Sequence, residues 1–287
     1  MNRFISCIAH NSSEGSLLAG DNRAALIDCG MAFCAGGTIQ KVKEALNGRR
    51  LDYILCTHTH YDHIGALPFF RKEWPRLRAV TVAAGAEVLL KDTPRRVIRE
   101  LSLAAAKNFG AAIDTAYSDD DFHADIIVKE GDRISLGALT VEVLETPGHT
   151  RDSLSFFIPE LEVLVLNETP GVLMPDGSFY PGYLTGYADT VRSIEKCRRI
   201  PYKFLSLPHR GIVSGEDAEG FFDKALDATA ACRGFILGMK EKGLHEDEML
   251  ESFFQHYSRG MLLSYQPKEA FLANARATIA CTLRENP

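Results

Sequence analysis

The sequence predicts an α/β fold, in which strands and helices alternate along the chain and pack in layers. Short apolar, strand-like runs alternate with helical spacings over the first half of the 287 residues. The composition is that of a folded protein, with 46% hydrophobic and 24% charged residues. These observations exclude a disordered chain, a collagen-like repeat and a coiled coil. The length fits one large domain or one domain with an appendage.

The elements of the first part of the chain follow in order. A strand at 24–28 precedes residues 37–48, whose apolar side chains have helical spacing, and strands are expected at 51–56 and 79–83. From residue 85 to 121 the pattern is helical, and Pro94 suits the first turn of a helix. Further strands are predicted at 124–128, 139–144, 153–158, 161–166 and, as the last one, 205–208.

The pattern changes from residue 215 onward. Apolar side chains recur every three or four residues, as a long amphipathic helix requires, over 222–239. Two more helical stretches are predicted at 246–257 and 267–284. The sequence therefore predicts a domain of residues 1–214, followed by a helical extension of residues 215–287 that packs on this body.

Charge and cysteine usage limit the classes of partner. The formal net charge is −6 and the basic residues are scattered, so we expect no nucleic-acid partner. No secretory signal and no run of ~18 apolar residues is found, so no membrane association is expected. Seven cysteines without a CxxC spacing indicate reduced thiols. The simplest account is a cytoplasmic protein with a small-molecule substrate; a homodimer is left open.

The segment 57–65, which reads T-H-T-H-Y-D-H-I-G, carries the strongest chemical signal. It places His58, His60, Asp62 and His63 directly after a predicted strand. His58 and His60 are two residues apart in an extended segment, so their side chains project to the same side. Asp62 and His63 lie where the chain turns into the next helix and can face a second centre. Imidazole and carboxylate are ligands that zinc and similar ions prefer, so the segment predicts a metal site; a surface histidine cluster is the alternative.

Two later histidines also follow predicted strands. His149 lies in T-P-G-H-T after the strand at 139–144, and His209 lies in P-H-R-G after the strand at 205–208. Each alone is a weak signal, because a histidine at a strand end is more often structural than a ligand. With the first cluster they make five histidines and an aspartate, which is enough to hold two ions.

Taken together, these motifs resemble those of the metallo-β-lactamase superfamily. The three segments occur in the expected order, and L-I-D-C-G at 26–30 matches the early aspartate motif of that family. The resemblance covers about residues 10–215 and implies an αββα sandwich, two sheets between helices, with the metal site at one edge; here the helical extension follows it. It further implies one ion held by His58, His60 and His149, a second held by Asp62, His63 and His209, and Asp28 orienting a ligand from outside.

The chain departs from the family pattern after the strand at 161–166. The family usually has an aspartate there that bridges the two ions, whereas this chain reads Asn167-Glu168-Thr169. Glu168 is the natural substitute, one methylene longer, and either bridges the ions or binds one of them. The alternative is that Glu168 points elsewhere and leaves the second site partly occupied.

The resemblance implies a dinuclear metal-dependent hydrolase that uses a metal-bound hydroxide, with Asp62 as the catalytic residue that orients it and moves its proton. The layout, with helices after the last ligand, resembles the glyoxalase II and quinolone-signal response thioesterase-like members. A small ester or thioester is therefore the expected substrate. Zinc is the expected ion, and iron and manganese also suit these ligands. The alternatives are a phosphodiesterase or ribonuclease of the same fold, or a non-catalytic regulator that binds a ligand.

Overall fold

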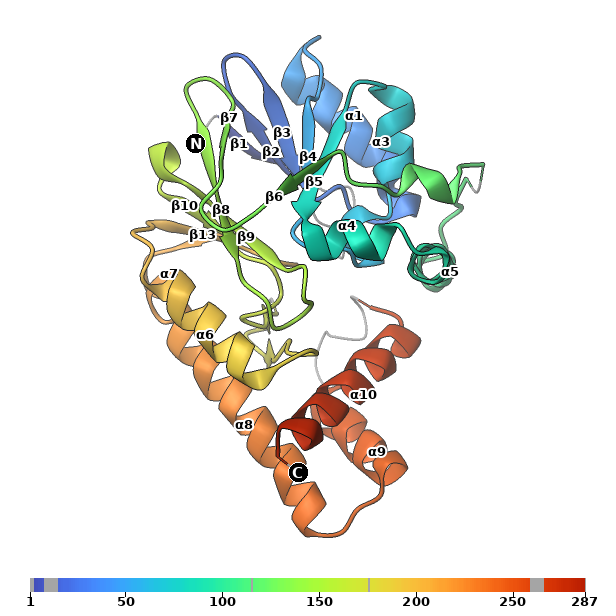
Figure 1. The fold of residues 1–287 in the computed structure, drawn as a ribbon, viewed down its shortest axis with the longest axis vertical. Coiled ribbons are helices and arrows are strands. Elements are labelled where there is room, and N and C mark those ends of the chain that lie inside the picture. The colour runs from blue at the N-terminus through green and yellow to red at the C-terminus, as the bar shows by residue number, and fades with distance from the viewer. Residues whose placement is uncertain (1–2, 8–14, 115, 175, 259–265, 287) are drawn as a thin grey trace. The chain divides into compact units, whose positions relative to one another are not determined.

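A computed structural model describes residues 3–7, 15–114, 116–174, 176–258 and 266–286 of the chain (Figure 1). The chain divides into two compact units. The first unit comprises Met1–Leu144 and Leu154–Val163, and the second unit comprises Glu145–Ser153 and Leu164–Pro287. The boundary expected between residues 214 and 215 stays a prediction.

A six-stranded mixed sheet forms the framework of the first unit. Its strands lie in sequence order: β1 (Phe4–Ser6), β2 (Ser16–Ala19), β3 (Ala24–Ile27), β4 (Tyr53–Leu55), β5 (Arg78–Val82) and β6 (Ile126–Val128). β1 to β3 pair antiparallel, and β3 to β6 pair parallel. Every residue of β3 and β4 is buried, as expected for parallel strands that are covered on both faces. Parallel strands end at the same edge of a sheet, so the segments that follow β3 and β4 lie side by side.

Five helices connect these strands: α1 (Ala35–Leu46), α2 (Tyr61–Ile64), α3 (Leu67–Glu73), α4 (Ala83–Leu89) and α5 (Asp92–Asn108). The prediction of a helical pattern up to residue 121 was wrong, because α5 ends at Asn108. Gly110 then adopts a positive φ of 63°, which a helix does not allow. The following segment is held by ion pairs instead: Arg95 contacts Asp120 at 2.8 Å and Arg99 contacts Asp119 at 2.6 Å.

A second six-stranded sheet has the order β14–β13–β10–β9–β8–β7. Its strands are β7 (Arg133–Ser135), β8 (Thr140–Glu145), β9 (Leu154–Ile158), β10 (Val163–Val165), β13 (Phe204–Leu207) and β14 (Gly211–Ser214). The strand at 204–207 is not the last one, contrary to the sequence prediction. A tight turn with positive φ at His209 and Gly211 returns the chain as β14, which pairs antiparallel with β13.

Helices dominate the rest of the second unit: α6 (Tyr187–Arg198), α7 (Glu216–Glu219), α8 (Phe221–Glu241), α9 (Glu246–Tyr257) and α10 (Lys268–Glu285). α8, α9 and α10 confirm the three helices expected after residue 215. With the hairpin of β11 (Val172–Leu173) and β12 (Phe179–Tyr180), they enclose an apolar core that includes Phe253 and Phe271. The tyrosines of this core, Tyr180 and Tyr183, bring polar hydroxyls into it.

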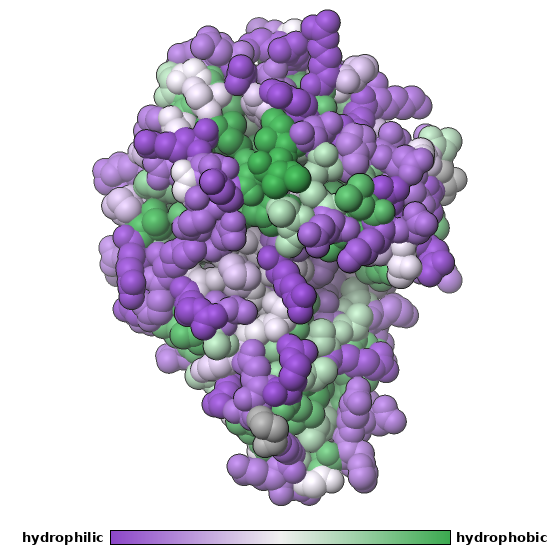
Figure 2. Space-filling view, viewed as in Figure 1, coloured by the Kyte–Doolittle hydropathy of each residue, from purple (hydrophilic) through white to green (hydrophobic). Residues whose placement is uncertain are grey.

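The face seen in Figure 2 is mainly hydrophilic, with one larger group of hydrophobic side chains in its upper half and smaller ones elsewhere. Large hydrophobic side chains exposed among the described residues are Leu90, Val97, Leu103, Ile127 and Ile212. None of the described helices combines the length and the apolar character needed to cross a membrane. All seven cysteines are buried, and none forms a disulfide.

Candidate metal centre

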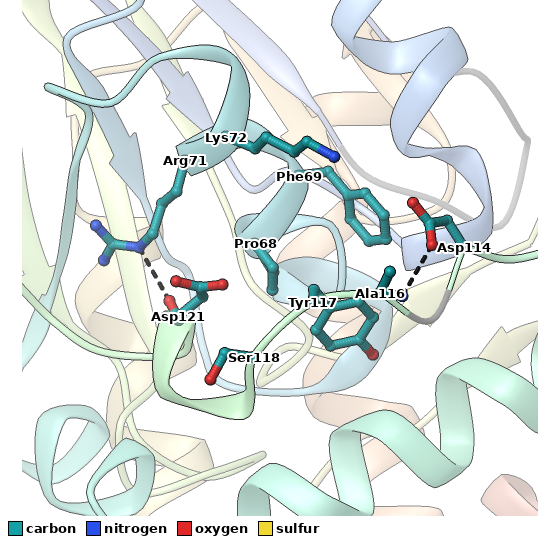
Figure 3. A pocket seen from close by; sticks show the side chains of 9 residues that line it. All are labelled: Pro68, Phe69, Arg71, Lys72, Asp114, Ala116, Tyr117, Ser118 and Asp121. Carbon is teal, nitrogen blue, oxygen red and sulfur yellow. Dashed lines mark hydrogen bonds between the residues drawn. The ribbon is translucent and has the colours of Figure 1, made fainter.

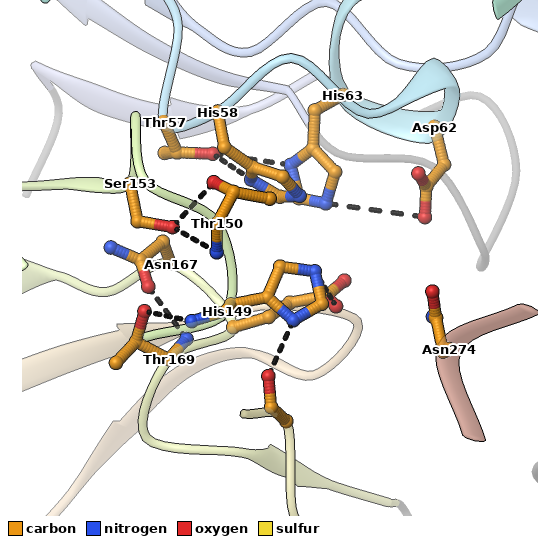
Figure 4. Close-up of polar contacts among 12 residues, drawn as sticks. Thr57, His58, Asp62, His63, His149, Thr150, Ser153, Asn167, Thr169 and Asn274 are labelled. Atoms are coloured by element: carbon orange, nitrogen blue, oxygen red, sulfur yellow. Dashed lines mark hydrogen bonds and ion pairs between the residues drawn. The ribbon is translucent and has the colours of Figure 1, made fainter. Parts of the chain in front are cut away.

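The first histidine cluster lies in the first unit, on the segment that leaves β4 and enters α2. His58 and His63 are buried, and His60 and Asp62 are partly exposed. The ring centroids of His58 and His60 are 4.7 Å apart, and those of His58 and His63 are 4.0 Å apart. The Nε2 atom of His63 lies 4.0 Å from Oδ2 of Asp62 (Figure 4). The structure thus gathers these four predicted ligands into one group.

Asp28, at the end of β3, fixes the orientation of this cluster from behind. Its Oδ1 accepts a hydrogen bond from the Thr57 backbone N–H at 2.8 Å, and its Oδ2 accepts one from the Thr57 hydroxyl at 2.7 Å. The same Oδ2 lies 2.8 Å from Nδ1 of His63. A carboxylate can only accept a hydrogen bond, so Nδ1 of His63 carries the proton and Nε2 presents its lone pair. Asp28 thus contacts His63 directly, as its predicted role in orienting a ligand requires.

His149, Glu168 and His209 form a second cluster, which lies in the second unit. Each follows the end of a strand, respectively β8, β10 and β13. Oε2 of Glu168 lies 3.1 Å from Nε2 of His149, and Oε1 lies 2.7 Å from Nε2 of His209. Glu168 therefore does not point elsewhere: its carboxylate lies between the two imidazoles, with one oxygen toward each.

The backbone around His149 is held by side chains that flank Glu168. The hydroxyl of Thr169 accepts a hydrogen bond from the His149 N–H at 3.1 Å and donates one to the carbonyl of Thr146 at 2.7 Å. Oδ1 of Asn167 accepts from the Thr169 N–H at 2.6 Å (Figure 4). In this Asn-Glu-Thr segment only Glu168 was predicted to belong to the site, and the two flanking residues were not. Their polar character directly after an apolar strand was the available signal.

The outer nitrogen of His149 is also fixed. Its Nδ1 lies 2.6 Å from the carbonyl oxygen of Gly182, which can only accept, so Nδ1 is the protonated atom and Nε2 carries the lone pair. Together with His63, this gives each cluster an imidazole whose free lone pair is set by an outer acceptor. Such outer hydrogen bonds are typical of histidines that bind metals. The donors, neutral imidazoles and carboxylates, suit zinc, iron and manganese alike.

A separate pocket of about 330 Å³ lies in the first unit between α3 and residues 114, 116–118 and 121 (Figure 3). Among its lining residues, Arg71 is engaged by the backbone carbonyl of Asp121 at 2.9 Å and by Asp125 at 2.7 Å, and Asp114 accepts from the N–H of Ala116. None of the predicted ligands lines it. Its charged groups serve mainly to hold the segment after α5 in place.

Comparison with known proteins gives the family. A model described as the metallo-beta-lactamase superfamily matches residues 15–209. A probable metallo-hydrolase of Bacillus subtilis (strain 168) is 25% identical over 210 residues, which cover 72% of this chain and 89% of that protein. A hydroxyacylglutathione hydrolase of Fuscovulum blasticum is 31% identical over 141 residues, covering 49% of this chain and 40% of that protein. A probable metallo-hydrolase of Burkholderia pseudomallei (strain 1710b) is 27% identical, and the match covers 56% of this chain and half (50%) of that protein.

Solved structures agree on the fold. A metallo-beta-lactamase family protein from Thermus thermophilus has a TM-score of 0.67 at 18% identity, covering 99% of this chain and 94% of its own. An archaeal superfamily protein from Sulfolobus tokodaii has a TM-score of 0.56 at 19% identity, covering 76% of this chain and 80% of its own. These likenesses confirm the predicted metallo-β-lactamase sandwich with C-terminal helices. Because the family model spans well over half of its residues, the chain belongs to the metallo-β-lactamase superfamily.

Proposed function

We propose that this protein is a dinuclear metal-dependent hydrolase that cleaves a small ester or thioester. The observation that carries the proposal is the Glu168 carboxylate, with one oxygen toward His149 at 3.1 Å and the other toward His209 at 2.7 Å. A carboxylate that offers one oxygen to each of two ligand sets has the arrangement of a bridging ligand. As the family pattern implies, we propose that one ion would be held by His58, His60 and His149 and the other by Asp62, His63 and His209, with Glu168 shared between them.

Bound divalent ions lower the pKa of a water molecule and polarise the carbonyl group under attack. The residues of the chain do the remaining work. Asp28 holds His63 in the ligating tautomer, and the Gly182 carbonyl does the same for His149. Asp62 is partly exposed at the start of α2, so its carboxylate can accept the proton of the attacking water and pass it to the leaving group. We therefore propose Asp62 as the catalytic residue.

The substrate class follows from relatives and from chemistry. Several hydroxyacylglutathione hydrolases are among the relatives, and the name of each describes cleavage of an acyl compound of glutathione. The chain matches less than half of each of these proteins, so the acyl substrate is part of the proposal. We propose zinc as the resident ion, with iron and manganese as the other candidates for this donor set. Seven buried, free thiols support a reducing compartment such as the cytoplasm.

The test compares the purified protein with His60→Ala and with a matched control, His256→Ala, which removes an exposed imidazole of α9 that is not a proposed ligand. Metal content is measured by elemental analysis. Turnover is measured on acyl thioesters, aryl esters and bis(4-nitrophenyl) phosphate. We expect about two ions per chain and thioester or ester hydrolysis in the wild type and the control, and loss of most metal and all hydrolysis in His60→Ala.

Other outcomes contradict the proposal in distinct ways. Retained activity in His60→Ala refutes the assigned role of the ligand. Turnover of the phosphodiester without turnover of acyl substrates indicates the phosphodiesterase. Two bound ions with no turnover on any of these substrates indicate the non-catalytic regulator.

A further inference from the structure

Two arginine side chains of the first unit converge on a single oxygen atom. Nη1 of Arg23 donates to the hydroxyl oxygen of Tyr53 at 3.0 Å, and Nη2 of Arg78 donates to the same oxygen at 2.8 Å. Both guanidiniums also lie over the tyrosine ring, with Cζ of Arg78 5.0 Å and Cζ of Arg23 5.9 Å from its centroid. The two arginines are exposed, whereas Tyr53 is only 3% exposed. A buried phenol therefore holds two exposed cations side by side.

The register of the first sheet explains why these side chains meet. Tyr53 begins β4, and its register partners are Ala25 in β3 and Arg78 in β5. Register partners on neighbouring strands project from the same face, and Arg23 lies two residues before Ala25, so it projects from that face as well. The three side chains thus stand at the edge where these parallel strands begin. The first histidine cluster follows the opposite end of β4, so the arginine pair is a separate feature.

The pair concentrates positive charge. Both donor nitrogens contact one oxygen, so they lie within about 6 Å of each other, a distance at which like charges repel. Three aspartates adjoin the pair through the chain or the sheet, and each is engaged by a different arginine: Asp21 by Arg3 at 2.8 Å, Asp52 by Arg50 at 2.7 Å and Asp125 by Arg71 at 2.7 Å. An anion from solution would relieve the repulsion between Arg23 and Arg78.

The donors match a phosphate group. A guanidinium is planar, permanently charged and presents paired N–H groups that fit two oxygens of a phosphate. Two guanidiniums carry two positive charges, which balance the charge of about −1.5 to −2 that a phosphate monoester has near neutral pH. A carboxylate brings only one negative charge. Because Tyr53 already orders both arginine side chains, a ligand does not have to immobilise them.

We propose that Arg23 and Arg78 form a binding site for the phosphate group of a small molecule, with Tyr53 as the platform that aligns them. The phosphate oxygens accept hydrogen bonds from the guanidinium N–H groups that Tyr53 does not use. Inorganic phosphate and a phosphate monoester share this chemistry, and both are possible sources of the group. The site uses no residue of the proposed metal centre, so it does not depend on the proposed function.

The experiment measures binding by isothermal titration calorimetry at constant ionic strength, with inorganic phosphate, glycerol 3-phosphate and acetate as the ligands. In Arg23→Gln and in Arg78→Gln we expect the affinity for phosphate to fall at least ~10-fold. The matched control is Arg96→Gln, which removes the same charge from an exposed arginine of α5 that pairs with Glu100 at 3.7 Å, and it should bind like the wild type. Tyr53→Phe keeps both cations but removes the shared oxygen, and it should also weaken binding.

Two further measurements keep the result specific. Ions in a metal centre would bind phosphate as well, so the titration is repeated with His60→Ala, in which binding at the arginine pair should persist. Scanning calorimetry shows whether each variant is folded. Phosphate should raise the melting temperature of the wild type, and the double variant of Arg23→Gln and Arg78→Gln should show no such rise.

These losses of affinity support the site, and the tighter of the two phosphate ligands identifies the source of the group. A wild type that binds neither ligand overturns the proposal, as does affinity that is unchanged in the double variant or lowered equally in Arg96→Gln. Acetate that binds as tightly as phosphate overturns the assignment to phosphate, and unchanged affinity in Tyr53→Phe overturns the role of the phenol. Binding that is lost in His60→Ala but kept in the arginine variants overturns the site and leaves the proposed function standing.

Discussion

The hydrogen bonds of Asp28 lead to a sharp prediction for Asp28→Asn. The substitution keeps the shape of the side chain and replaces one acceptor oxygen with an NH₂ donor. An amide can keep the contact of Oδ1 with the Thr57 N–H, at 2.8 Å, and then presents its NH₂ to Nδ1 of His63. Nδ1 must now accept, so the imidazole proton moves to Nε2. The expected result is a His63 whose ligating lone pair is lost while its position is kept.

The magnitude follows from the number of contacts. The carboxylate of Asp28 accepts three buried hydrogen bonds, and two of them go to the oxygen that is replaced. Two hydrogen bonds to a charged group contribute about 3–6 kcal/mol, and the new neutral bond from the amide to Nδ1 returns about 0.5–1.5 kcal/mol, so we expect Asp28→Asn to lower the free energy of unfolding by about 2–5 kcal/mol. Loss of the ligating tautomer should weaken binding of the ion assigned to His63 by ~10–100-fold.

The assay combines urea unfolding, zinc titration and nitrogen NMR of the imidazoles, which distinguishes the two tautomers. A matched control is Asp52→Asn, which also removes a buried carboxylate, one that accepts from the Ala24 N–H at 3.0 Å and from Arg50 at 2.7 Å. The control should lose stability without losing metal affinity. If Asp28→Asn binds both ions with wild-type affinity, or His63 keeps its proton on Nδ1, the assigned role of Asp28 is refuted.

Two further predictions concern the second unit. Gly148→Ala should destabilise the fold by about 3 kcal/mol in urea unfolding, because φ is +147° and a Cβ would stand 2.2 Å from the hydroxyl oxygen of Thr190. The control is Gly177→Ala, where φ is +82° and the space around the Cβ is open, so the cost should be only ~1 kcal/mol. Equal costs in the two variants would contradict the packing argument. Burial raises the pKa of Cys232 from 9.0 to about 12. As the pH rises, the unfolded chain therefore loses the thiol proton before the folded protein does. Between pH values equal to these two pKa values, the free energy of unfolding should fall by ~1.4 kcal/mol per pH unit. Cys232→Ala should make the change in the free energy of unfolding per pH unit smaller by the amount that one proton contributes. An unchanged slope would show that the thiol has the same pKa in the folded and the unfolded protein.

The sequence pointed to the candidate ligands because metal binding requires rare residue types at fixed spacings. His58, His60 and His63 could be assigned on sequence spacing alone, and the structure brings them together. What orients them could be assigned only in part. Asp28 was accessible through a family motif, whereas the carbonyl of Gly182 was not. A backbone acceptor leaves no mark on residue type.

The elements of the fold also differ in how clearly the sequence predicts them. Buried parallel strands such as β3 and β4, and long amphipathic helices such as α8, were predicted because their apolar patterns are continuous. Helix α5 was extended too far because apolar residues continue beyond Asn108, while the left-handed backbone at Gly110 ends the helix. β14 was missed because it is short and its Ile212 side chain is exposed.

Asp28 and His209 share a backbone feature. Both have positive φ angles, 55° and 58°, which lie in the left-handed region that favours glycine. Such a conformation costs an ordinary residue about 1 kcal/mol or more, so glycine at either position would relieve that strain while deleting a proposed ligand or its support. At Asp28 the three buried hydrogen bonds outweigh this relief, so a library screened for heat resistance alone should keep the aspartate. At His209 the relief is opposed by the contact with Glu168, so the same screen would be expected to enrich substitutions there, and its survivors would be robust but inert. Directed evolution of this scaffold should therefore select on turnover in every round, or hold the codon of His209 constant.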